Sequence, residues 1–263
     1  MLARAVLYFV LLGTLAMNHG FAEQSLKFGT VSGFSPYVIE DTDGLKGIDI
    51  DMVKAVCKRL KQKCEFKQMA WNEVQAKLRS GKLDMGFSGF QNEERKSYAY
   101  FLEEYLHKST FQVFVKPGGE FPFAELKDLV GMKFASGKGQ KIGPRFDSML
   151  ASGQIKMLRF KKIEDMFQAL DTGKVDGVIG NSQQYRYYLK QQYKLNAYRV
   201  LPGELTSSKP SYLMISKKAP SMEAEKIKEQ WNKAFNELVA EGYREKLLRK
   251  YIGEEEKKRP VFQ

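Results

Sequence analysis

Cysteine and histidine are scarce in this sequence. Its 263 residues include two cysteines, Cys57 and Cys64, and two histidines, His19 and His107. A structural metal site takes about four such ligands close together, and neither histidine is near the cysteines in the chain. We therefore expect no metal site and no cofactor.

Long hydrophobic runs are scarce too. The one clear run, Ala5–Ala16, is shorter than the about 20 apolar residues that a membrane-spanning helix takes. It is followed by Gly20 and Ala22, small residues at the spacing that signal peptidase recognises. We therefore expect residues 1–22 to be a secretory signal peptide that is cleaved before Glu23. No cysteine lies near the cut to carry a lipid anchor, so we expect the mature chain to be exported and free.

A concentration of one charge sign is also absent along the chain. The formal net charge is +12, but the 43 lysines and arginines are interspersed with 31 acidic residues. There is no basic stripe interleaved with aromatic residues, which would favour a nucleic-acid-binding surface. We interpret the charge as solvated surface and expect no nucleic-acid partner. With 43% hydrophobic and 28% charged residues, the composition indicates a soluble globular chain of one large or two modest domains.

After the expected signal peptide, the apolar pattern alternates between strand and helix. The strand pattern of SLKFGTVS is followed by apolar residues at the spacing of an amphipathic helix, namely Ile50, Val53, Val56, Cys57 and Leu60. We then expect a strand in CEFKQMAW, a helix in NEVQAKLRSG with Asn72 as its N-cap and Gly81 at its end, and a strand in KLDMGFSG. This is the order of βαβ units, which build a mostly parallel sheet.

The phrase that closes this first round occurs a second time. SGKLDMGFSG covers Ser80–Gly89, and TGKVDGVIGN covers Thr172–Asn181. Identical residues align in pairs: Leu78 with Leu170, Gly81 with Gly173, Lys82 with Lys174, and Asp84 with Asp176. Each copy describes a helix that ends, a glycine turn, and a strand that enters a sheet.

A second round of strands and helices leads to the second copy. It comprises a strand at Met132–Ser136, a helix at about Gly143–Ala151, a strand in IKMLRF and a helix in IEDMFQALDTG. The start of the first round is echoed as well, because KFGTVSG at Lys27 resembles KFASGKG at Lys133. The second round therefore repeats the order of the first.

Two rounds of the same order predict two lobes. Open parallel sheets bind ligands just beyond the carboxyl ends of their strands, and Ser88 and Asn181 stand at two such ends. The apolar strand TFQVFVK carries the chain out of the first lobe, and ELTSSKP, rich in turn-forming residues, brings it back. We expect lobe 1 to comprise residues 23–112 and 208–263, including two C-terminal helices, and lobe 2 to comprise residues 113–207.

The stretch GIDIDMVKAVCKRL resembles the signature of the bacterial extracellular solute-binding proteins, family 3, the periplasmic receptors of polar amino-acid ABC transporters. The resemblance extends through LDMGFSG with EER, GMKFASGKGQ, GKVDGVIGN and AEGYREKLLRKY. Within the family the pattern is most similar to the lysine/arginine/ornithine- and histidine-binding proteins, which share two cysteines at this spacing. The resemblance implies the α/β type II periplasmic-binding-protein fold: two lobes, each a mostly parallel sheet flanked by helices, joined by a two-crossing hinge.

The two cysteines lie at the end of an expected helix and in the next strand. In an oxidising compartment Cys57 and Cys64 can form a disulfide, and the alternative is a pair of buried thiols. The resemblance implies the disulfide, within lobe 1.

The resemblance also implies where a ligand binds. The rings of Phe34 and Trp71 would lie on the two sides of the ligand's side chain, where an aromatic face attracts a cation. The planar guanidinium of Arg95 would bind a carboxylate in bidentate fashion, beside a helix N-terminus capped by Asn92. Without the resemblance, either ring is more often part of a core, and Arg95 is explained as an ordinary solvated helix residue.

The segments that follow the two repeated phrases complete the implied site. It would use Gly139, Gln140 and Lys141 of lobe 2, and Ser88, Gly89, Phe90 and Gln91 of lobe 1. Between Asp84 and Arg95 the chain is one residue shorter than the family pattern. The register of the lobe 1 residues is therefore left open.

Two substitutions depart from the receptors of basic amino acids. Asn181 stands where the family has the acid that receives the ligand's α-ammonium, and Val31 stands where the basic-amino-acid receptors have an acid. A neutral amide accepts a hydrogen bond but supplies no countercharge. The sequence therefore argues against a typical basic amino acid as the ligand.

The resemblance implies a monomeric periplasmic receptor that captures a small carboxylate-bearing solute, an amino acid or a derivative, for an ABC transporter permease. One alternative is an enzyme on the same scaffold, as in cyclohexadienyl dehydratases, which needs a general acid or base in the cleft. Glu93 and Glu94 are candidates by position alone, and no Ser/His/Asp constellation is visible, so we expect no enzymatic activity. The other alternative is a sensing or scavenging protein without a permease.

Overall fold

The computed structural model describes residues 25–254 except positions 32 and 204. The expected signal peptide at 1–22 and the expected mature N-terminus at Glu23 lie outside the described residues. Among the described residues, no helix combines the length and the apolar character that crossing a membrane requires.

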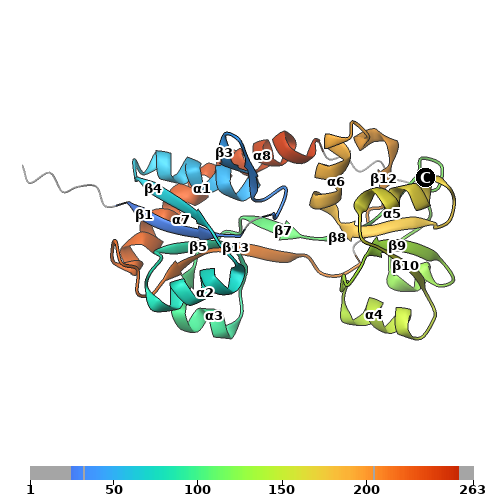
Figure 1. Cartoon of the computed structure of the whole chain (residues 1–263), viewed down its shortest axis with the longest axis horizontal. Coiled ribbons are helices and arrows are strands. Elements are labelled where there is room, and N and C mark those ends of the chain that lie inside the picture. The colour runs from blue at the N-terminus through green and yellow to red at the C-terminus, as the bar shows by residue number, and fades with distance from the viewer. Residues whose placement is uncertain (1–24, 32, 204, 255–263) are drawn as a thin grey trace, which may run out of the picture.

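The chain builds two separate sheets with helices packed on both (Figure 1). We call the part on the first sheet lobe 1. Its strand order is β4-β1-β5-β13-β6, with β7 paired to β13. The bounds of these strands are β1 Leu26–Thr30, β4 Cys64–Gln68, β5 Met85–Phe90, β6 Ala99–Phe101, β7 His107–Ser109 and β13 Lys209–Ser216.

We call the part on the second sheet lobe 2. Its strand order is β10-β9-β11-β8-β12. The bounds are β8 Phe111–Val115, β9 Lys133–Gly137, β10 Lys156–Phe160, β11 Gly177–Asn181 and β12 Arg199–Val200. The order β10-β9-β11-β8 repeats the order β4-β1-β5-β13, as two rounds of one pattern should.

The helices follow the strands in the expected alternation. Lobe 1 carries α1 Ile48–Arg59, α2 Trp71–Ser80, α3 Glu93–Tyr98, α7 Ala224–Ala240 and α8 Tyr243–Ile252. Lobe 2 carries α4 Pro144–Ala151, α5 Ile163–Asp171 and α6 Ser182–Gln191, with short 3₁₀ turns η1 Leu126–Leu129 and η2 Leu195–Ala197. A small hairpin, β2 Ile39–Asp41 and β3 Gly44–Lys46, precedes α1. The predicted α/β order is confirmed.

Parallel pairing is confined to the strands of the βαβ units. β1 pairs in parallel with β4 and β5, and β9 pairs in parallel with β10 and β11. β13 and β8, which carry the chain between the lobes, are antiparallel to β5 and β11. Each sheet is therefore mixed, with a parallel core and antiparallel strands added at one side.

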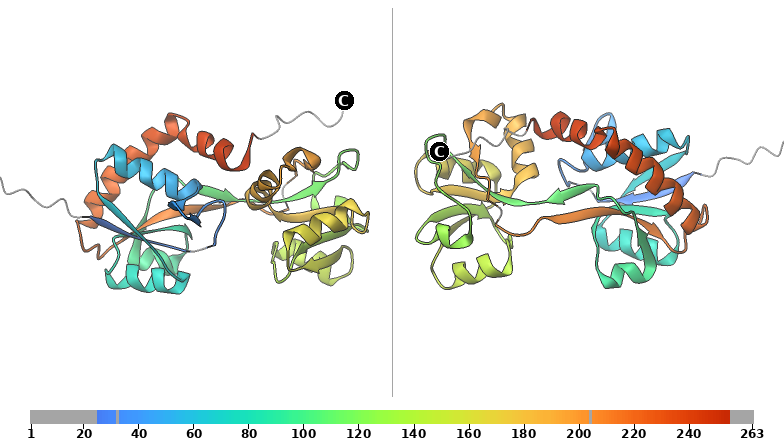
Figure 2. Two further views of the ribbon diagram at one scale, coloured as in Figure 1. Left: turned by 45° about the horizontal axis from the view of Figure 1, so that its top comes forward. Right: turned by 180° about the vertical axis from the view of Figure 1, so that it is seen from behind.

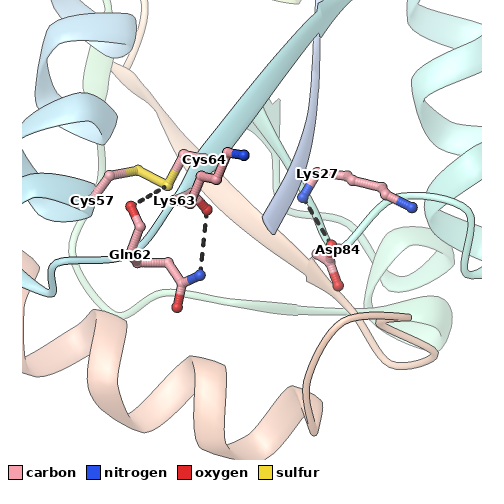
Figure 3. Close-up of a disulfide and its surroundings, with 6 residues drawn as sticks. All are labelled: Lys27, Cys57, Gln62, Lys63, Cys64 and Asp84. Atoms are coloured by element: carbon pink, nitrogen blue, oxygen red, sulfur yellow. Dashed lines mark hydrogen bonds between the residues drawn. A yellow bond between two sulfur atoms is a disulfide. The ribbon is translucent and has the colours of Figure 1, made fainter. Parts of the chain in front are cut away.

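The repeated phrase has the same structural role in both lobes. Asp84 accepts a hydrogen bond from the Lys27 backbone N–H at 2.8 Å (Figure 3), and Asp176 accepts one from the Lys133 backbone N–H at 2.7 Å. Gly81 takes a left-handed φ of 74° where α2 ends, in the conformation that glycine adopts most readily. Each aspartate therefore fixes the start of the neighbouring strand, and the predicted equivalence of Lys27 with Lys133 is confirmed.

Apolar residues of α1, α7 and α8 form the main core of lobe 1 on one face of its sheet. Trp231 of α7 lies against Phe28 of β1 with ring centroids 5.4 Å apart, and both side chains are fully buried. α2 and α3 cover the opposite face through a smaller cluster around Val74 and Leu78. Two further clusters bury the two faces of the lobe 2 sheet.

The disulfide between Cys57 and Cys64 is confirmed. The S–S distance is 2.08 Å and the Cα–Cα distance is 6.4 Å. It joins the last turn of α1 to the first residue of β4 (Figure 3). The tight connection between these two elements of lobe 1 is thereby held covalently.

The predicted boundary between β4 and α2 is wrong. Trp71 opens the helix and does not end the strand, and the N-cap position belongs to Ala70, without a side-chain cap, so Asn72 is not the cap. The reason is the ladder with β1, which ends at the pair Thr30 and Gln68. Once that pairing stops, the chain turns directly into the helix.

Two chain crossings join the lobes. One runs from β7 into β8, the other leads into β13, and Figure 1 shows them between the sheets. The Thr110 and Ser208 hydroxyl groups hydrogen bond at 2.7 Å across the two crossings. The lobe boundaries at 112/113 and 207/208 stay predictions, and they lie close to the starts of β8 and β13.

The C-terminal helices pack on lobe 1, and α8 also contacts lobe 2 (Figure 2). The Lys190 ammonium of α6 donates to the carbonyl oxygens of Arg249 at 3.2 Å and Lys250 at 2.6 Å. A cation at the carbonyl end of a helix is favoured by the helix dipole. The end of α8 therefore contributes to the position of lobe 2.

Candidate ligand-binding site

The carboxyl ends of the parallel strands of the two lobes face each other. The loop after β1 places the Tyr37 hydroxyl 3.3 Å from Asn181 Oδ1, at the end of β11, and Tyr37 donates this hydrogen bond. The partners come from different lobes. Because β9, β10 and β11 are parallel, the loops after all three strands lie on the edge of lobe 2 that faces lobe 1.

Both polar atoms of the Asn181 side chain form hydrogen bonds within the protein. Its Oδ1 also accepts from the Gln184 backbone N–H at 3.1 Å, which makes it the N-cap of α6. Its Nδ2 donates to Ser109 Oγ at 2.7 Å. The side chain is 5% exposed. In this arrangement Asn181 organises the junction of the lobes and offers no free countercharge to a ligand.

A buried polar network lies beneath the loop after β1. Asp49, on α1, is 0% exposed and accepts from Ser88 Oγ at 2.6 Å. His107 Nδ1 lies 2.8 Å and 3.0 Å from the two Asp49 carboxylate oxygens, and it donates because a carboxylate only accepts. The Tyr37 ring stacks on the His107 ring with centroids 3.6 Å apart. Burial, with the Asp49 charge added to it, raises the pKa of Tyr37, so its hydroxyl stays a donor.

Sequence reasoning missed Tyr37, Asp49 and His107 as members of this network. A signal existed for Asp49, which lies four and seven residues before Val53 and Val56 and so shares the apolar face of the helix. A charged residue on a buried helix face needs a partner. Nothing local identifies His107, because it is 58 positions away in the chain.

The segment at the end of β5 is closely packed. Ser88 has a left-handed φ of 67°, which aims its side chain at Asp49. At Gly89, an added Cβ would lie 2.9 Å from the methyl of Met214 and 3.0 Å from the Trp71 ring, so this position has no room for a side chain. Phe90 is 40% exposed, and Gln91 is also exposed.

Arg95 is held in place by lobe 1. Its Nη1 donates to the Phe90 carbonyl at 2.6 Å, and its Nε donates to Gln75 Oε1 at 3.4 Å. The guanidinium lies 5.1 Å from the centre of the Trp71 ring. Asn92 accepts from the Arg95 backbone N–H at 2.8 Å and caps α3, as predicted. Trp71 therefore supports the arginine through a cation–π contact.

Phe34 has other neighbours. Its ring lies 4.8 Å from the Tyr37 ring and 6.0 Å from the His107 ring. Val31 is half-buried in the same loop. No ring contact joins Phe34 to Trp71 within the described part of the chain, so their role as a clamp on a ligand remains a prediction.

The lobe 2 loop after β9 is held by its own side chains. Gln140 Oε1 accepts from Ser136 Oγ at 2.7 Å and from the Gly137 backbone N–H at 3.3 Å. Arg159 Nη1 donates to the carbonyls of Gly137 at 3.3 Å and Gln140 at 3.0 Å. Gly139, with a φ of 77°, and Lys141 are exposed at the surface of this loop.

The two halves of the predicted site are not in contact. Among the described residues, no hydrogen bond, ion pair or ring contact joins Trp71 or residues 88–95 to the loop at 137–141. Contact between the facing edges is made through Tyr37 and Asn181 instead. In this arrangement the Arg95 guanidinium is bonded within lobe 1, to Phe90 and Gln75.

The groups considered for catalysis or metal binding have other roles. Glu93 pairs with Lys96 at 2.9 Å and Glu94 pairs with Arg79 at 2.8 Å, and all four residues are exposed. Within the described residues, no group of three or more His, Cys, Asp or Glu side chains is placed to hold a metal ion.

The chain is similar to known proteins over most of its length. The family model described as bacterial extracellular solute-binding proteins, family 3, matches residues 26–254. The arginine-binding extracellular protein ArtP of Bacillus subtilis is 24% identical over 262 residues, which cover 96% of each chain. The histidine-binding periplasmic protein of Escherichia coli is 22% identical over 235 residues, covering 87% of this chain and 88% of the relative.

Solved structures show the same fold. A substrate-binding protein of a polar amino acid ABC uptake transporter from Streptococcus thermophilus superposes with a TM-score of 0.74 at 22% identity. The match covers 88% of this chain and 87% of that one. The predicted two-lobed fold of periplasmic binding proteins is confirmed.

Proposed function

Because the chain belongs to the bacterial extracellular solute-binding proteins, family 3, we propose that it is the receptor of an ABC transporter and captures a small carboxylate-bearing solute, an amino acid or a derivative. The relatives named above bind arginine and histidine. The ligand would lie between the two facing sheet edges, and closure of the lobes around it would create the form that the permease recognises.

The placement of Arg95 carries this proposal. Its guanidinium stands just beyond the carboxyl end of β5, held by the Phe90 carbonyl and the Trp71 ring. A guanidinium has five N–H donors, so groups remain for a ligand carboxylate after these contacts. Arg95 lies beyond the same strand-end edge of lobe 1 as Tyr37, which contacts Asn181 of lobe 2. A carboxylate held by Arg95 is therefore available to contacts from the other lobe.

We propose that Ser88, Gly89, Phe90 and Gln91 line the lobe 1 side of the cleft, and that Gly139, Gln140 and Lys141 close it from lobe 2. Phe34 lies on the same side of lobe 1 as Tyr37, where it can contact the ligand's apolar part. Asn181 acts through its bonds to Tyr37 and Ser109, by positioning the two lobes.

The location and partners follow from the same proposal. The relatives are named as extracellular or periplasmic proteins. We place this chain in the periplasm as a monomer, exported by its N-terminal signal and acting with a permease in the inner membrane. No described feature favours the catalytic alternative, since Glu93 and Glu94 are held in surface ion pairs.

A binding screen tests the proposal. The mature protein, residues 23–263, is tested by thermal shift against the amino acids and small carboxylic acids, because a ligand that binds the folded state alone raises the melting temperature. At least one of these compounds is expected to raise it and to bind in titration calorimetry.

Two variants give the screen its control. Arg95→Ala is expected to weaken binding of the hit about 100-fold, because a charge-assisted bond to the carboxylate is lost. Arg79→Ala removes an exposed arginine from the far end of α2 and should leave affinity within about twofold. If no compound binds, or if both variants bind like the wild type, the proposal is wrong.

A further inference from the structure

Cations gather at the edge of lobe 2 that faces lobe 1. The segments 137–141 and 159–162, which follow or end β9 and β10, contain no acidic residue. They carry five exposed cations, which we call the cationic edge: Lys138, Lys141, Arg159, Lys161 and Lys162. Along the chain these residues form two short groups, and the parallel pairing of β9 with β10 brings the groups together.

Hydrogen bonds hold the two segments side by side. The Lys138 backbone N–H donates to the Phe160 carbonyl at 2.7 Å. Arg159 reaches across to the carbonyls of Gly137 and Gln140. The cationic edge is therefore a fixed part of lobe 2. It shares its side of the sheet with Asn181, which touches Tyr37 of lobe 1.

The cationic edge has no internal countercharge. None of its members forms an ion pair with another described residue. Three carboxylates lie near it in sequence: Glu164 and Asp165 in the first turn of α5, and Asp147 of α4, which accepts a hydrogen bond from the Ile142 backbone N–H at 3.4 Å. None of the three forms an ion pair with the cationic edge. On lobe 1 the situation is different, because Glu73, Glu93 and Glu94 pair with Lys77, Lys96 and Arg79 respectively.

Where the two lobes touch, the described residues offer no free acid for a ligand ammonium. Asn181 is neutral and its amide is already bonded on both atoms. Asp49 is fully buried and bonded to Ser88 and His107. A cationic or zwitterionic ligand would therefore meet Arg95 and the cationic edge without a compensating negative group.

We propose that the ligand is a small dianion with two acidic groups and no ammonium group, such as a dicarboxylate. One carboxylate binds Arg95 on lobe 1 and the other binds the cationic edge of lobe 2. This inference rests on the proposed function and names the class of solute that the same site takes.

The charges also couple closure to the ligand. Without an anion, closing the cleft brings Arg95 toward the cationic edge, and like charges repel. A dianion placed between them turns this repulsion into two attractions. In a closing cleft with little water, such interactions are stronger than on an open surface. A ligand with one carboxylate leaves the positive charge on one side of the cleft without a negative partner.

The test is titration calorimetry on the mature protein with matched probes. Succinate and glutarate represent the dianions, and L-aspartate and L-glutamate carry the same two carboxylates with an added α-ammonium. L-glutamine is the neutral analogue of L-glutamate, and L-arginine is the cationic probe. At least one dianion is expected to bind about tenfold or more tightly than both L-glutamine and L-arginine, as the gain of a charge-assisted bond allows.

A double variant locates the effect. Lys138→Gln with Lys141→Gln is expected to weaken binding of the best dianion about tenfold, and to weaken binding of L-glutamine less than that. Lys156→Gln with Lys174→Gln is the matched control, because it removes the same charge from exposed lysines at the opposite edge of the lobe 2 sheet. The control should bind the dianion like the wild type within about twofold.

The outcomes separate this inference from the proposed function. If L-glutamine or L-arginine binds as tightly as the dianions or more tightly, the dianion inference is wrong and the receptor proposal stands. If the two double variants weaken binding equally, the dianion inference is also wrong, because the effect would then not depend on where on the surface the lysines lie. If no amino acid or carboxylate binds, both are wrong.

Discussion

The repeated phrase is buried in lobe 1 and exposed in lobe 2. Asp84 of lobe 1 is fully buried and accepts from the Lys27 and Ser221 backbone N–H groups and from the Ser221 hydroxyl, each at 2.8 Å. Asp176 of lobe 2 is exposed and accepts from the Lys133 backbone N–H. The turn after β13 covers the lobe 1 copy. The repeated sequence therefore forms the same local hydrogen bond in both lobes, but we expect it to contribute more to stability in lobe 1, where it is buried.

The glycines of the phrase show the same contrast. An added Cβ at Gly81 would lie 2.4 Å from the Lys218 carbonyl oxygen, whereas at Gly173 nothing lies within 4 Å. Lobe 1 has further internal ties in its disulfide and in the Asp49–His107 pair. The comparison indicates that lobe 1, which carries Arg95, has more internal contacts of this kind than lobe 2, which carries the charged loops.

The largest expected effect comes from the buried charge of lobe 1. His107→Ala leaves the Asp49 carboxylate buried, with Ser88 as its remaining side-chain partner among the described residues. We expect a loss of about 3 to 5 kcal/mol in the free energy of unfolding. The measurement is urea denaturation. The double variant Asp49→Asn with His107→Gln, which has no buried charge, should lose less than His107→Ala. A loss under about 1 kcal/mol for His107→Ala would show that the Asp49 carboxylate does not depend on His107 as a buried partner.

The next effect compares the two copies of the phrase directly. Asp84→Ala leaves several donors without an acceptor in a buried place, and we expect it to cost about 3 kcal/mol of stability. Asp176→Ala, at the exposed equivalent position, should cost about 1 kcal/mol or less. Both are measured by urea denaturation of the mature protein. Equal losses would mean that burial does not distinguish the lobes.

The disulfide gives the smallest of these effects. Replacing Cys57 and Cys64 by serine removes a bridge across a short loop, and we expect a loss of about 2 kcal/mol. A reducing agent should lower the wild-type melting temperature toward that of the double variant and leave the double variant unchanged. If reduction affects both proteins alike, the stabilisation does not come from the bridge.

Much of the fold was predictable from local sequence. The helix at Ile48–Arg59 follows from its apolar spacing, and Gly81 ends α2 because the left-handed turn favours glycine. The equivalence of Asp84 and Asp176 followed from the repeated phrase. The start of α2 was missed because the end of the β1–β4 ladder, a contact between distant segments, decides where the strand stops.

The site was less predictable. Arg95 was identified through the family resemblance, but its stacking on Trp71 depends on how α2 and α3 lie together. The buried pair of Asp49 and His107 joins residues that are far apart in the chain. The cations of residues 137–141 and 159–162 form two separate groups in the sequence, and the pairing of β9 with β10 brings them to one edge. Contacts of this kind are set by topology, which local patterns do not contain.

The central claim is that one ligand is held between the two lobes. Small-angle X-ray scattering of the mature protein, with and without a saturating concentration of the tightest compound from the binding screen, tests it most directly. The account predicts that the ligand reduces the radius of gyration of the wild type, because the lobes close around it, and that Arg95→Ala shows no reduction at the same concentration. A ligand that binds the wild type tightly and leaves its radius of gyration unchanged would contradict the account.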